Sequence, residues 1–502
     1  MLRLRFPRLA YNPISIAGAV IAVVVAALIV ILLAIHAFQQ SWNPYLGIFV
    51  YMVLPPVLVL GLVLVPIGMI RQKRIIKRTG QAPVPQWPYI DLNLRTHRNA
   101  FFVFAFGSIA FALIAAVGGY QAYHYTESVT FCGETCHIIM RPEHTAYQNS
   151  PHARVACTEC HVGSGAGWYA KSKLSGLYQV YATLADVYPR PIPTPIESLR
   201  PAQETCEQCH WPAKFFGNQM RRFDHYMYDE ENTHWPVNML VKTGGGEPKL
   251  TETGGIHWHM NISVKIEYIA RDERRQDIPW VRVSRPDGSV TVYQDEGEAL
   301  GEEEIGTAQI RRMDCVDCHN RPSHKYNPPD RLIDRAVVTG QVDPALPEIK
   351  RVAVEALSGE YETEEGALAA IADKITRFYG ENHPETLESS RAALDRAIAA
   401  TQECYAQNIF PEMKVRWDGY PDNIGHFIYP GCMRCHDGEH ADAAGRAISR
   451  DCSSCHVIMM QGSGDRAQMA ETLDGLEFVH PEDIGDEWRE TACFECHTGT
   501  QP

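Results

Sequence analysis

A short cysteine and histidine motif recurs along this chain of 502 residues and limits what the chain can fold into. The pattern Cys-x-x-Cys-His occurs six times, and a seventh copy carries one additional residue between its cysteines. The two thiols of such a motif bond to the edge of a c-type haem, and the adjacent imidazole binds the iron. In chain order the motifs begin at Cys132 (the longer copy), Cys157, Cys206, Cys315, Cys432, Cys452 and Cys493. The sequence therefore predicts seven covalently bound c-type haems and a function in electron transfer.

The motifs use 14 of the 15 cysteines, which argues against the other common uses of paired cysteines. A disulfide framework would not place a histidine after every second cysteine. A structural zinc site needs four converging ligands, and a histidine directly after every cysteine pair is the wrong pattern for such a site. The remaining Cys404 is expected to be a buried free thiol, with a redox or ligand role as the alternative. The predicted haem-attaching residues are Cys132, Cys136, Cys157, Cys160, Cys206, Cys209, Cys315, Cys318, Cys432, Cys435, Cys452, Cys455, Cys493 and Cys496.

The iron of each haem also needs axial ligands from the protein. In the first motif the additional residue would bulge the loop beneath the porphyrin, so His137 and Met140 are alternative ligands there. A thioether ligand would raise the reduction potential of that iron. The predicted proximal ligands of the regular motifs are His161, His210, His319, His436, His456 and His497.

Histidines outside the motifs are the candidates for the distal position. His257 and His259 alternate along a predicted strand, so at most one of them is expected to reach a given haem. The predicted distal ligands are His152, His257, His259, His324, His426, His440 and His480. Further alternatives are His144, His225 and His234.

Three apolar runs, at about 15–38, 46–70 and 100–123, are long enough to cross a bilayer, which takes about 20 residues. The first run exceeds the apolar core of a signal peptide and is expected to be a retained anchor. Pro55-Pro56 is expected to kink the second. Residues 1–125 are therefore predicted to form a membrane domain with three transmembrane helices.

The distribution of charge predicts how this domain is oriented. Arg3, Arg5 and Arg8 favour a cytoplasmic N-terminus, and so do the seven Lys/Arg of the loop 71–99. Residues from 124 onward are then expected in the periplasm of a bacterium, beyond its inner membrane. Residues 1–125 carry +9 and the whole chain −14, so residues 126–502 carry −23. Such a domain favours partners with basic docking faces and disfavours nucleic acid.

The haem-bearing part is expected to be mainly α-helical and irregular structure packed around porphyrins. Residues 126–335 hold four motifs and a β-containing insertion at 216–310, where Pro286-Asp287-Gly288 predicts a hairpin turn. Helical periodicity predicts a helical connector at 336–403. Residues 404–502 are expected to form a C-terminal domain with three haems.

A membrane span followed by Cys132–Met140, Ser150-Pro151-His152 and Cys157–His161 resembles the NapC/NirT (NrfH-like) family of membrane-anchored multihaem cytochromes. The resemblance covers about 100–330, and seven haems with three spans are similar to its heptahaem ImcH-type subgroup. It implies a quinol:cytochrome c oxidoreductase, which takes electrons from menaquinol and passes them to periplasmic c-type cytochromes in anaerobic respiration. It also implies a quinol site beside the first haem.

Family members place a Lys and a carboxylate after the second motif. Lys171 and Lys173 match the Lys, whereas no carboxylate follows at the expected spacing. Quinol oxidation releases protons, so nearby ionisable groups are candidates for the quinol site. These candidates are Lys171, Lys173, His124, Glu127, Glu143 and His144.

Two other functions remain open on the sequence. The chain could be an electron-conduit subunit of a larger respiratory complex, in which a partner membrane subunit meets the quinone; the missing carboxylate favours this alternative. It could also be a terminal oxyanion reductase with one open haem, although the many spare histidines argue against an open position.

Overall fold

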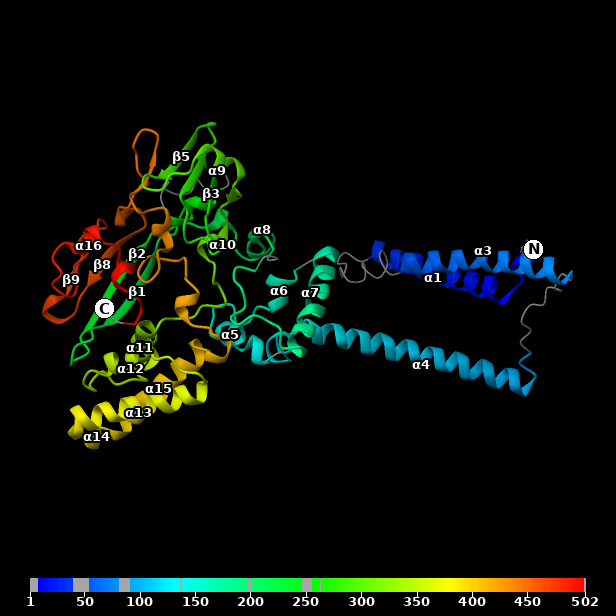
Figure 1. The fold of residues 1–502 in the computed structure, drawn as a ribbon, viewed down its shortest axis with the longest axis horizontal. Helices are drawn as coiled ribbons and strands as arrows, with labels where there is room; N and C mark the ends of the chain where they lie inside the picture. Colours follow the sequence, from blue (N-terminus) through cyan, green and yellow to red (C-terminus); the bar gives the residue numbers. More distant parts are fainter. Residues whose placement is uncertain are drawn as a thin grey trace. The chain divides into compact units, whose positions relative to one another are not determined.

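The computed structural model describes residues 8–38, 54–80, 91–135, 137–163, 165–196, 200–245, 255–261 and 263–500 (Figure 1). The chain divides into two compact units. The first comprises residues 1–128 and 161–181, and the second comprises residues 129–160 and 182–502. All seven motifs except His161 of the second motif fall in the second unit.

Two long apolar helices of the first unit are candidate membrane spans. Helix α1 (Pro13–Phe38) is apolar enough over Pro13–Val30, and helix α3 (Leu54–Thr79) over its whole length. Helix α4 (Arg95–Thr126) contains the third predicted span, but many of its side chains lie outside the description. Two of the three predicted spans are thus supported within the described residues, and the span at 100–123 stays a prediction.

Small residues let α1 and α3 pack closely. A Cβ on Gly18 would lie 2.6 Å from the Gly61 carbonyl oxygen, and one on Gly61 would lie 2.9 Å from the Ala22 nitrogen. The Ser15 hydroxyl also donates a 2.8 Å hydrogen bond to the Val65 carbonyl oxygen across the pair. Small residues and a polar contact of this kind are how helices associate in a bilayer, where burial of apolar surface does not drive them together.

The kink predicted at Pro55-Pro56 stays a prediction. Both prolines lie in the first described turn of α3, and the residues before Leu54 lie outside the description. The helix also continues past the predicted end at residue 70 to Thr79. Residues 46–53 of the predicted span lie outside the described residues.

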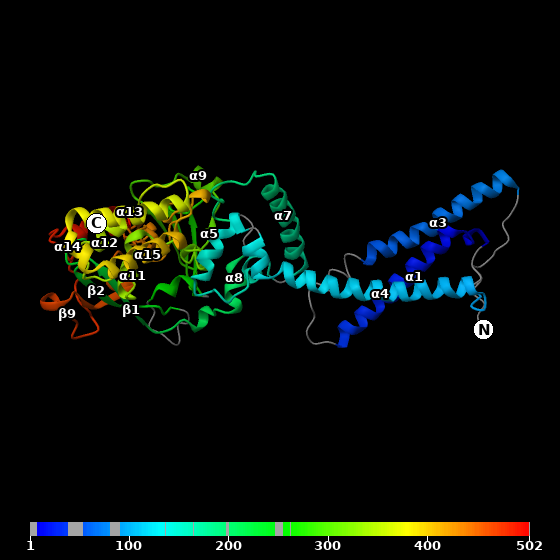
Figure 2. The same ribbon diagram turned by 90° about the horizontal axis from the view of Figure 1, so that it is seen from below.

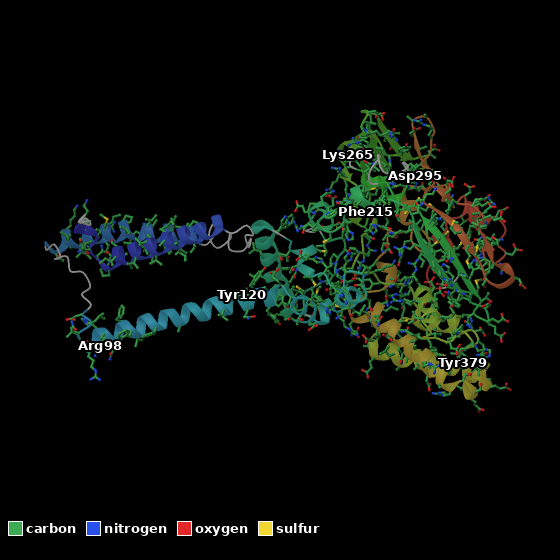
Figure 3. The ribbon with its side chains drawn as sticks, turned by 180° about the vertical axis from the view of Figure 1, so that it is seen from behind. Arg98, Tyr120, Phe215, Lys265, Asp295 and Tyr379 are labelled. Atoms are coloured by element: carbon green, nitrogen blue, oxygen red, sulfur yellow. The ribbon has the colours of Figure 1, made fainter. Side chains whose placement is uncertain are left out.

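Five helices form the largest apolar core of the second unit. They are α11 (Pro329–Val338), α12 (Ile349–Leu357), α13 (Glu364–Asn382), α14 (Pro384–Ser389) and α15 (Arg391–Asn408). Ile371, Ile375 and Tyr379 on one face of α13 are fully buried in this core, and Tyr379 is labelled in Figure 3. Helices α13 and α15 lie side by side in Figures 1 and 2. The helices predicted at 336–403 are confirmed, but they build a core rather than a connector.

Two β-sheets hold the rest of the second unit together. One has the strand order β1 (Gln219–Tyr226), β2 (His234–Val241), β8 (His456–Gln461), β9 (Gln468–Met469). The other has the order β6 (Arg311–Arg312), β3 (Lys265–Ile269), β4 (Trp280–Ser284), β5 (Val290–Asp295), β7 (His440–Asp442). Lys265 on β3 and Asp295 on β5 are labelled in Figure 3.

The hairpin predicted around Pro286-Asp287-Gly288 is confirmed as β4 and β5, which pair antiparallel. The rest of the predicted division is not observed. Strand β7 pairs with β5 and strand β8 pairs with β2, so the C-terminal motifs share both sheets with the 216–310 segment. The structure therefore has more β-structure than predicted and no boundary at residue 404.

Two of the remaining α-helices are longer than two turns, α5 (His137–Gln148) and α7 (Ala166–Leu184). The short α-helices are α6 (Cys157–His161), α8 (Ala202–Thr205), α9 (Glu302–Thr307), α10 (Cys315–Cys318), α16 (Glu487–Glu490) and α17 (Cys493–Cys496). Several of them contain a Cys-x-x-Cys sequence.

Candidate haem centres

Each regular motif forms one tight helical turn. The second, fourth and seventh motifs form α6, α10 and α17. The third, fifth and sixth contain the 3₁₀ turns η4 (Cys206–Gln208), η9 (Gly431–Arg434) and η10 (Cys452–Ser454). Residues three apart on such a turn lie on the same side of it, so both thiols of a motif face the same way. This is the arrangement that attachment to one porphyrin edge requires.

The first motif forms a wider turn. Phe131–Thr135 is a π-helical segment (η3), which accommodates one additional residue per turn. The predicted bulge in this loop is therefore present. Cys136 and the side chain of His137 lie outside the described residues, and Met140 is half-buried on α5. The choice between His137 and Met140 as the ligand stays open.

Five motif histidines lie opposite a second histidine at the spacing that one iron would need. The ring centres of these pairs are 5.9–6.3 Å apart. An imidazole nitrogen binds a metal at about 2 Å, so two imidazoles on opposite sides of one iron have centres roughly 6 Å apart. The pairs are His210 with His152, His319 with His257, His436 with His259, His456 with His426, and His497 with His480.

Hydrogen bonds to backbone carbonyl oxygens fix the orientation of four of these ten rings. Nδ1 of His152 donates to the Pro322 carbonyl oxygen (3.2 Å) and Nδ1 of His257 to that of Thr243 (2.6 Å). His259 and the motif residue His436 make the same kind of bond, to the carbonyl oxygens of Ile256 and Ser449. A histidine that binds metal through Nε2 usually donates its other N–H to such an acceptor, which fixes the tautomer and the ring direction.

Burial lowers the pKa of His259, His319, His426, His456 and His497, which favours the neutral form that binds metal. Burial lowers the pKa of His259, and the neighbouring His436 lowers it further. Burial, helped by His480, His225 and Lys350, lowers the pKa of His497 to about 4. Within the described residues no group of three or more His, Cys, Asp or Glu side chains could hold a bare metal ion. Paired imidazoles with two thiols beside one of them are the donor set that a c-type haem needs.

One predicted distal ligand, His440, has both ring nitrogens engaged by protein groups. His440 is buried, its Nε2 donates to the Ile278 carbonyl oxygen at 2.6 Å, and its Nδ1 faces the Asp437 carboxylate at 2.9 Å. Both ring nitrogens are therefore used by the protein. The short spacing from the fifth motif, on which the prediction depended, comes instead from the turn that leads into β7.

The predicted strand through His257 and His259 is also wrong. These residues lie in a 3₁₀ turn, η6 (Ile256–Met260), and each faces the histidine of a different motif. The expectation that only one of them reaches a given haem agrees with this placement. His324 donates from Nδ1 to the Glu143 carbonyl oxygen at 3.0 Å, the same kind of bond that orients the paired rings, and it remains a proposed ligand.

The other histidine alternatives lie in different environments. His234 uses Nε2 for a 2.8 Å contact with the Asp224 carboxylate, and His225 lies 3.7 Å from that of Asp334. His144 packs on Gly133, the residue after Cys132, where an added Cβ would lie 2.5 Å from its ring. Among the motif histidines whose side chains the structure describes, none faces any of these three at the spacing of the five pairs.

Thiols of successive motifs lie close together in chain order. The side chains of Cys132 and Cys157 lie close enough to interact, and so do those of Cys206 and Cys315. The other neighbouring motifs are close enough for electrostatic interaction between their thiols: Cys160 with Cys206, Cys318 with Cys432, Cys432 with Cys455, and Cys452 with Cys493. The seven attachment sites thus form one connected series, from the first motif to the seventh.

A buried network joins the loops of the fourth and fifth motifs. Asp317, inside the fourth motif, accepts from the Tyr268 hydroxyl (2.7 Å) and from Arg275 and Arg311 (2.8 Å each). Arg434, inside the fifth motif, donates to the backbone oxygens of Asp317 (2.9 Å) and Arg275 (2.6 Å). The sequence analysis missed these residues, although an Asp and an Arg at the variable positions of two motifs are visible in the sequence.

The quinol-site candidates are divided between the two units. His124 and Glu127 lie at the end of α4, and Lys171 and Lys173 lie on α7, all in the first unit. The Lys171 ammonium lies 5.2 Å from the Trp168 ring centre, whereas the side chain of Lys173 lies outside the description. Glu143 and His144 lie on α5 in the second unit. Burial raises the pKa of Glu143 despite the attraction of Arg321.

Cys404 is a half-buried thiol on α15. Burial raises its pKa to about 11, and its sulfur lies 3.9 Å from the Leu332 carbonyl oxygen. A protonated, packed thiol of this kind is unreactive, in agreement with the predicted structural role.

The comparisons with known proteins agree with this arrangement. Residues 95–191 match the N-terminal region of the NapC/NirT cytochrome c family. The chain is 48% identical over 487 residues to the cytochrome c-type protein ImcH of Geobacter sulfurreducens, covering 97% of this chain and 95% of that protein. No solved structure matches the chain. The chain is therefore a membrane-anchored electron-transfer cytochrome with covalently bound haem, and it belongs to the NapC/NirT cytochrome c family.

Proposed function

We propose that this protein is a quinol dehydrogenase of the bacterial inner membrane, which passes electrons from menaquinol through seven c-type haems to periplasmic cytochromes. The observation that carries the proposal is the connected series of attachment thiols. It begins at Cys132, six residues after the end of α4 at Thr126, and reaches Cys493 through every intermediate motif in order. A series of this kind suits a protein that moves electrons away from a membrane.

The described side chains supply most of what seven haems would need. Two cysteines per motif would hold each porphyrin, and the motif histidine would bind its iron. We propose His152, His257, His259, His426 and His480 as distal ligands of the third to seventh haems, on the ring spacings given above. His324 is proposed as a further ligand. When bound, the haems supply one-electron redox chemistry, while the protein fixes their order and ligation.

The membrane end of the protein would hold the quinol site. His124 and Glu127 follow the proposed third span directly, and Lys171 adds a positive charge on α7. Ionisable groups at this level can accept the protons that quinol releases on oxidation. The basic flanks of the spans favour a cytoplasmic N-terminus and a periplasmic haem domain.

One feature favours the conduit alternative, in which a partner subunit meets the quinone. No carboxylate follows the second motif at the spacing expected from the family, and the next acidic residue is Asp186. By contrast, the five facing histidine pairs would leave no open position at their irons. That arrangement disfavours an oxyanion reductase at those sites.

Anaerobic stopped-flow spectroscopy of the purified chain separates the first two functions. We expect a menaquinol analogue to reduce the haems rapidly, and Lys171→Ala to slow that reduction. Lys77→Ala, at the exposed end of α3 on the proposed cytoplasmic side, is the matched control and should leave the rate unchanged. If dithionite reduces the wild-type haems and the quinol does not, the chain is a conduit that needs another subunit.

A further inference from the structure

The seventh motif is the last member of the thiol series and it lies near the surface. Cys496 is exposed, and His480 lies opposite His497 with ring centres 6.1 Å apart. The ring of Phe427 also stacks on His497 at 4.4 Å. The surroundings of His480 therefore decide what can approach this end of the electron path.

A cavity of about 390 Å³ opens beside His480. Its aromatic lining comes from Phe478 and Trp488, whose rings pack edge to face at 5.5 Å. Glu482 and Asp483 also line the cavity. An aromatic floor with carboxylates at its edge is thus adjacent to the proposed distal ligand of the seventh haem.

The chain around this cavity is strongly acidic. Residues 461–500 contain ten Asp/Glu and two Arg, which gives a net charge of −8. Both arginines are already engaged: Arg489 pairs with Glu477 and Asp486, and Arg466 donates to the Pro481 carbonyl oxygen at 2.6 Å. Glu482 and Asp483 are exposed and form no ion pair with any described residue. Their charges are therefore available to a partner.

Apolar side chains are interspersed with these acids. Met469 and Leu473 are about three-quarters exposed, at 76% and 75%, and Ile484 on the cavity wall is 39% exposed. Transient protein interfaces combine an apolar centre with a charged rim in this way. A site for a small cation would not need an exposed apolar side chain such as Ile484 on its wall.

We infer that the acidic face formed by His480, Glu482, Asp483, Ile484 and Trp488 docks a c-type cytochrome that carries lysines around its haem edge. The inference rests on the proposed function, because it assigns the exit of the electron path to the seventh haem. Complementary charge steers such a partner and orients its haem edge toward His480. His480 and His497 would hold the haem that gives one electron to the oxidised haem of the partner, with no bond or proton transferred.

The test measures binding of a small, soluble, lysine-rich cytochrome c to the full haem-loaded chain in detergent. Both proteins are kept oxidised, and binding is followed by interferometry at about 20 mM and about 200 mM salt. The test variant is Glu482→Lys/Asp483→Lys. The matched control is Glu302→Lys/Glu303→Lys, another adjacent pair of exposed acids, on α9. Both variants must keep the wild-type haem spectrum.

We expect wild-type binding that weakens steeply with salt, and a loss of about tenfold or more at low salt for the test variant. The control should change binding by less than about twofold. Equal losses in both variants, no loss in the test variant, or wild-type binding that is independent of salt would each overturn the inference. Because the assay uses no quinol, failure of quinol-dependent reduction would contradict the proposed function and leave this result intact.

Discussion

Replacing Asp317 tests whether the buried network between the fourth and fifth motifs holds the haem-bearing unit together. The Asp317 side chain is 2% exposed and accepts from the Arg275 and Arg311 guanidinium groups, which are 24% and 32% exposed. Asp317→Asn keeps the shape of the side chain but removes the charge that both arginines face. It also places an N–H₂ group where the Asp314 backbone nitrogen donates to Asp317 at 2.7 Å.

Removing one partner of a buried charge pair costs about 3–5 kcal/mol. Partial exposure of both arginines puts Asp317→Asn at the lower end, about 3 kcal/mol, because water can solvate the guanidinium groups left behind. For a unit of this size that corresponds to a fall in Tm of about 4 °C. Thermal unfolding of the haem-loaded chain, followed in the Soret band, measures it.

Asp373→Asn is the control. Its carboxylate pairs with Arg377 on the surface, where both side chains are about 60% exposed, so the change should leave the Tm within about 1 °C. A Tm for Asp317→Asn that equals the control would refute the reasoning, because the network would then contribute nothing to stability. Slower electron transfer beyond the fourth haem, without a change in Tm, would assign Asp317 to haem placement alone.

Three further predictions concern the ligands, the membrane helices and pH. His259→Ala should leave one iron five-coordinate and add a high-spin signal to the absorption and EPR spectra. His440→Ala should keep the low-spin spectra of the wild type. The reverse result would contradict the proposed assignment of His259 as a ligand. Gly61→Leu should separate α1 from α3, because the Cβ of the new side chain would lie 2.9 Å from the Ala22 nitrogen. Crosslinking between cysteines placed on the two helices measures the separation, and unchanged crosslinking would contradict this packing. Burial opposes ionisation of Glu267, but Lys265 and Arg282 outweigh it and hold its pKa below the usual 4.5. Its contribution to stability is therefore present above about pH 4.5 and is lost as the pH falls through the lowered pKa, so Glu267→Gln should flatten that acid limb of the Tm profile.

Local sequence signals predicted the haem attachment sites, the β4–β5 hairpin and the helices of the main core. Each depends on residues close together in the chain: the motifs, the Pro286-Asp287-Gly288 turn, and the spacing of Ile371 and Ile375 on α13. The structure describes all of these features apart from parts of the first motif.

The sequence could not predict which histidine lies opposite which motif histidine. His259 lies opposite His436, far along the chain, because the fold brings η6 to the fifth motif. The prediction of His440 as a ligand rests on its closeness to a motif in the sequence, but its Nε2 donates to the carbonyl oxygen of Ile278, a residue distant in the sequence. The sheet pairings of β7 and β8 are equally non-local, and for this reason the predicted boundary at residue 404 does not appear in the structure.

The position of β8 has a consequence for how the protein matures. His456 ends the sixth motif and is also the first residue of β8, the inner strand that pairs with β2. Strands β1 and β2 lie far before β8 in the chain, and without β8 and β9 they would form an isolated hairpin, which is marginally stable in water. Sheet closure thus waits for the segment that carries the sixth motif. The enzymes that attach haem there would meet an open chain, and attachment would come before the sheet locks.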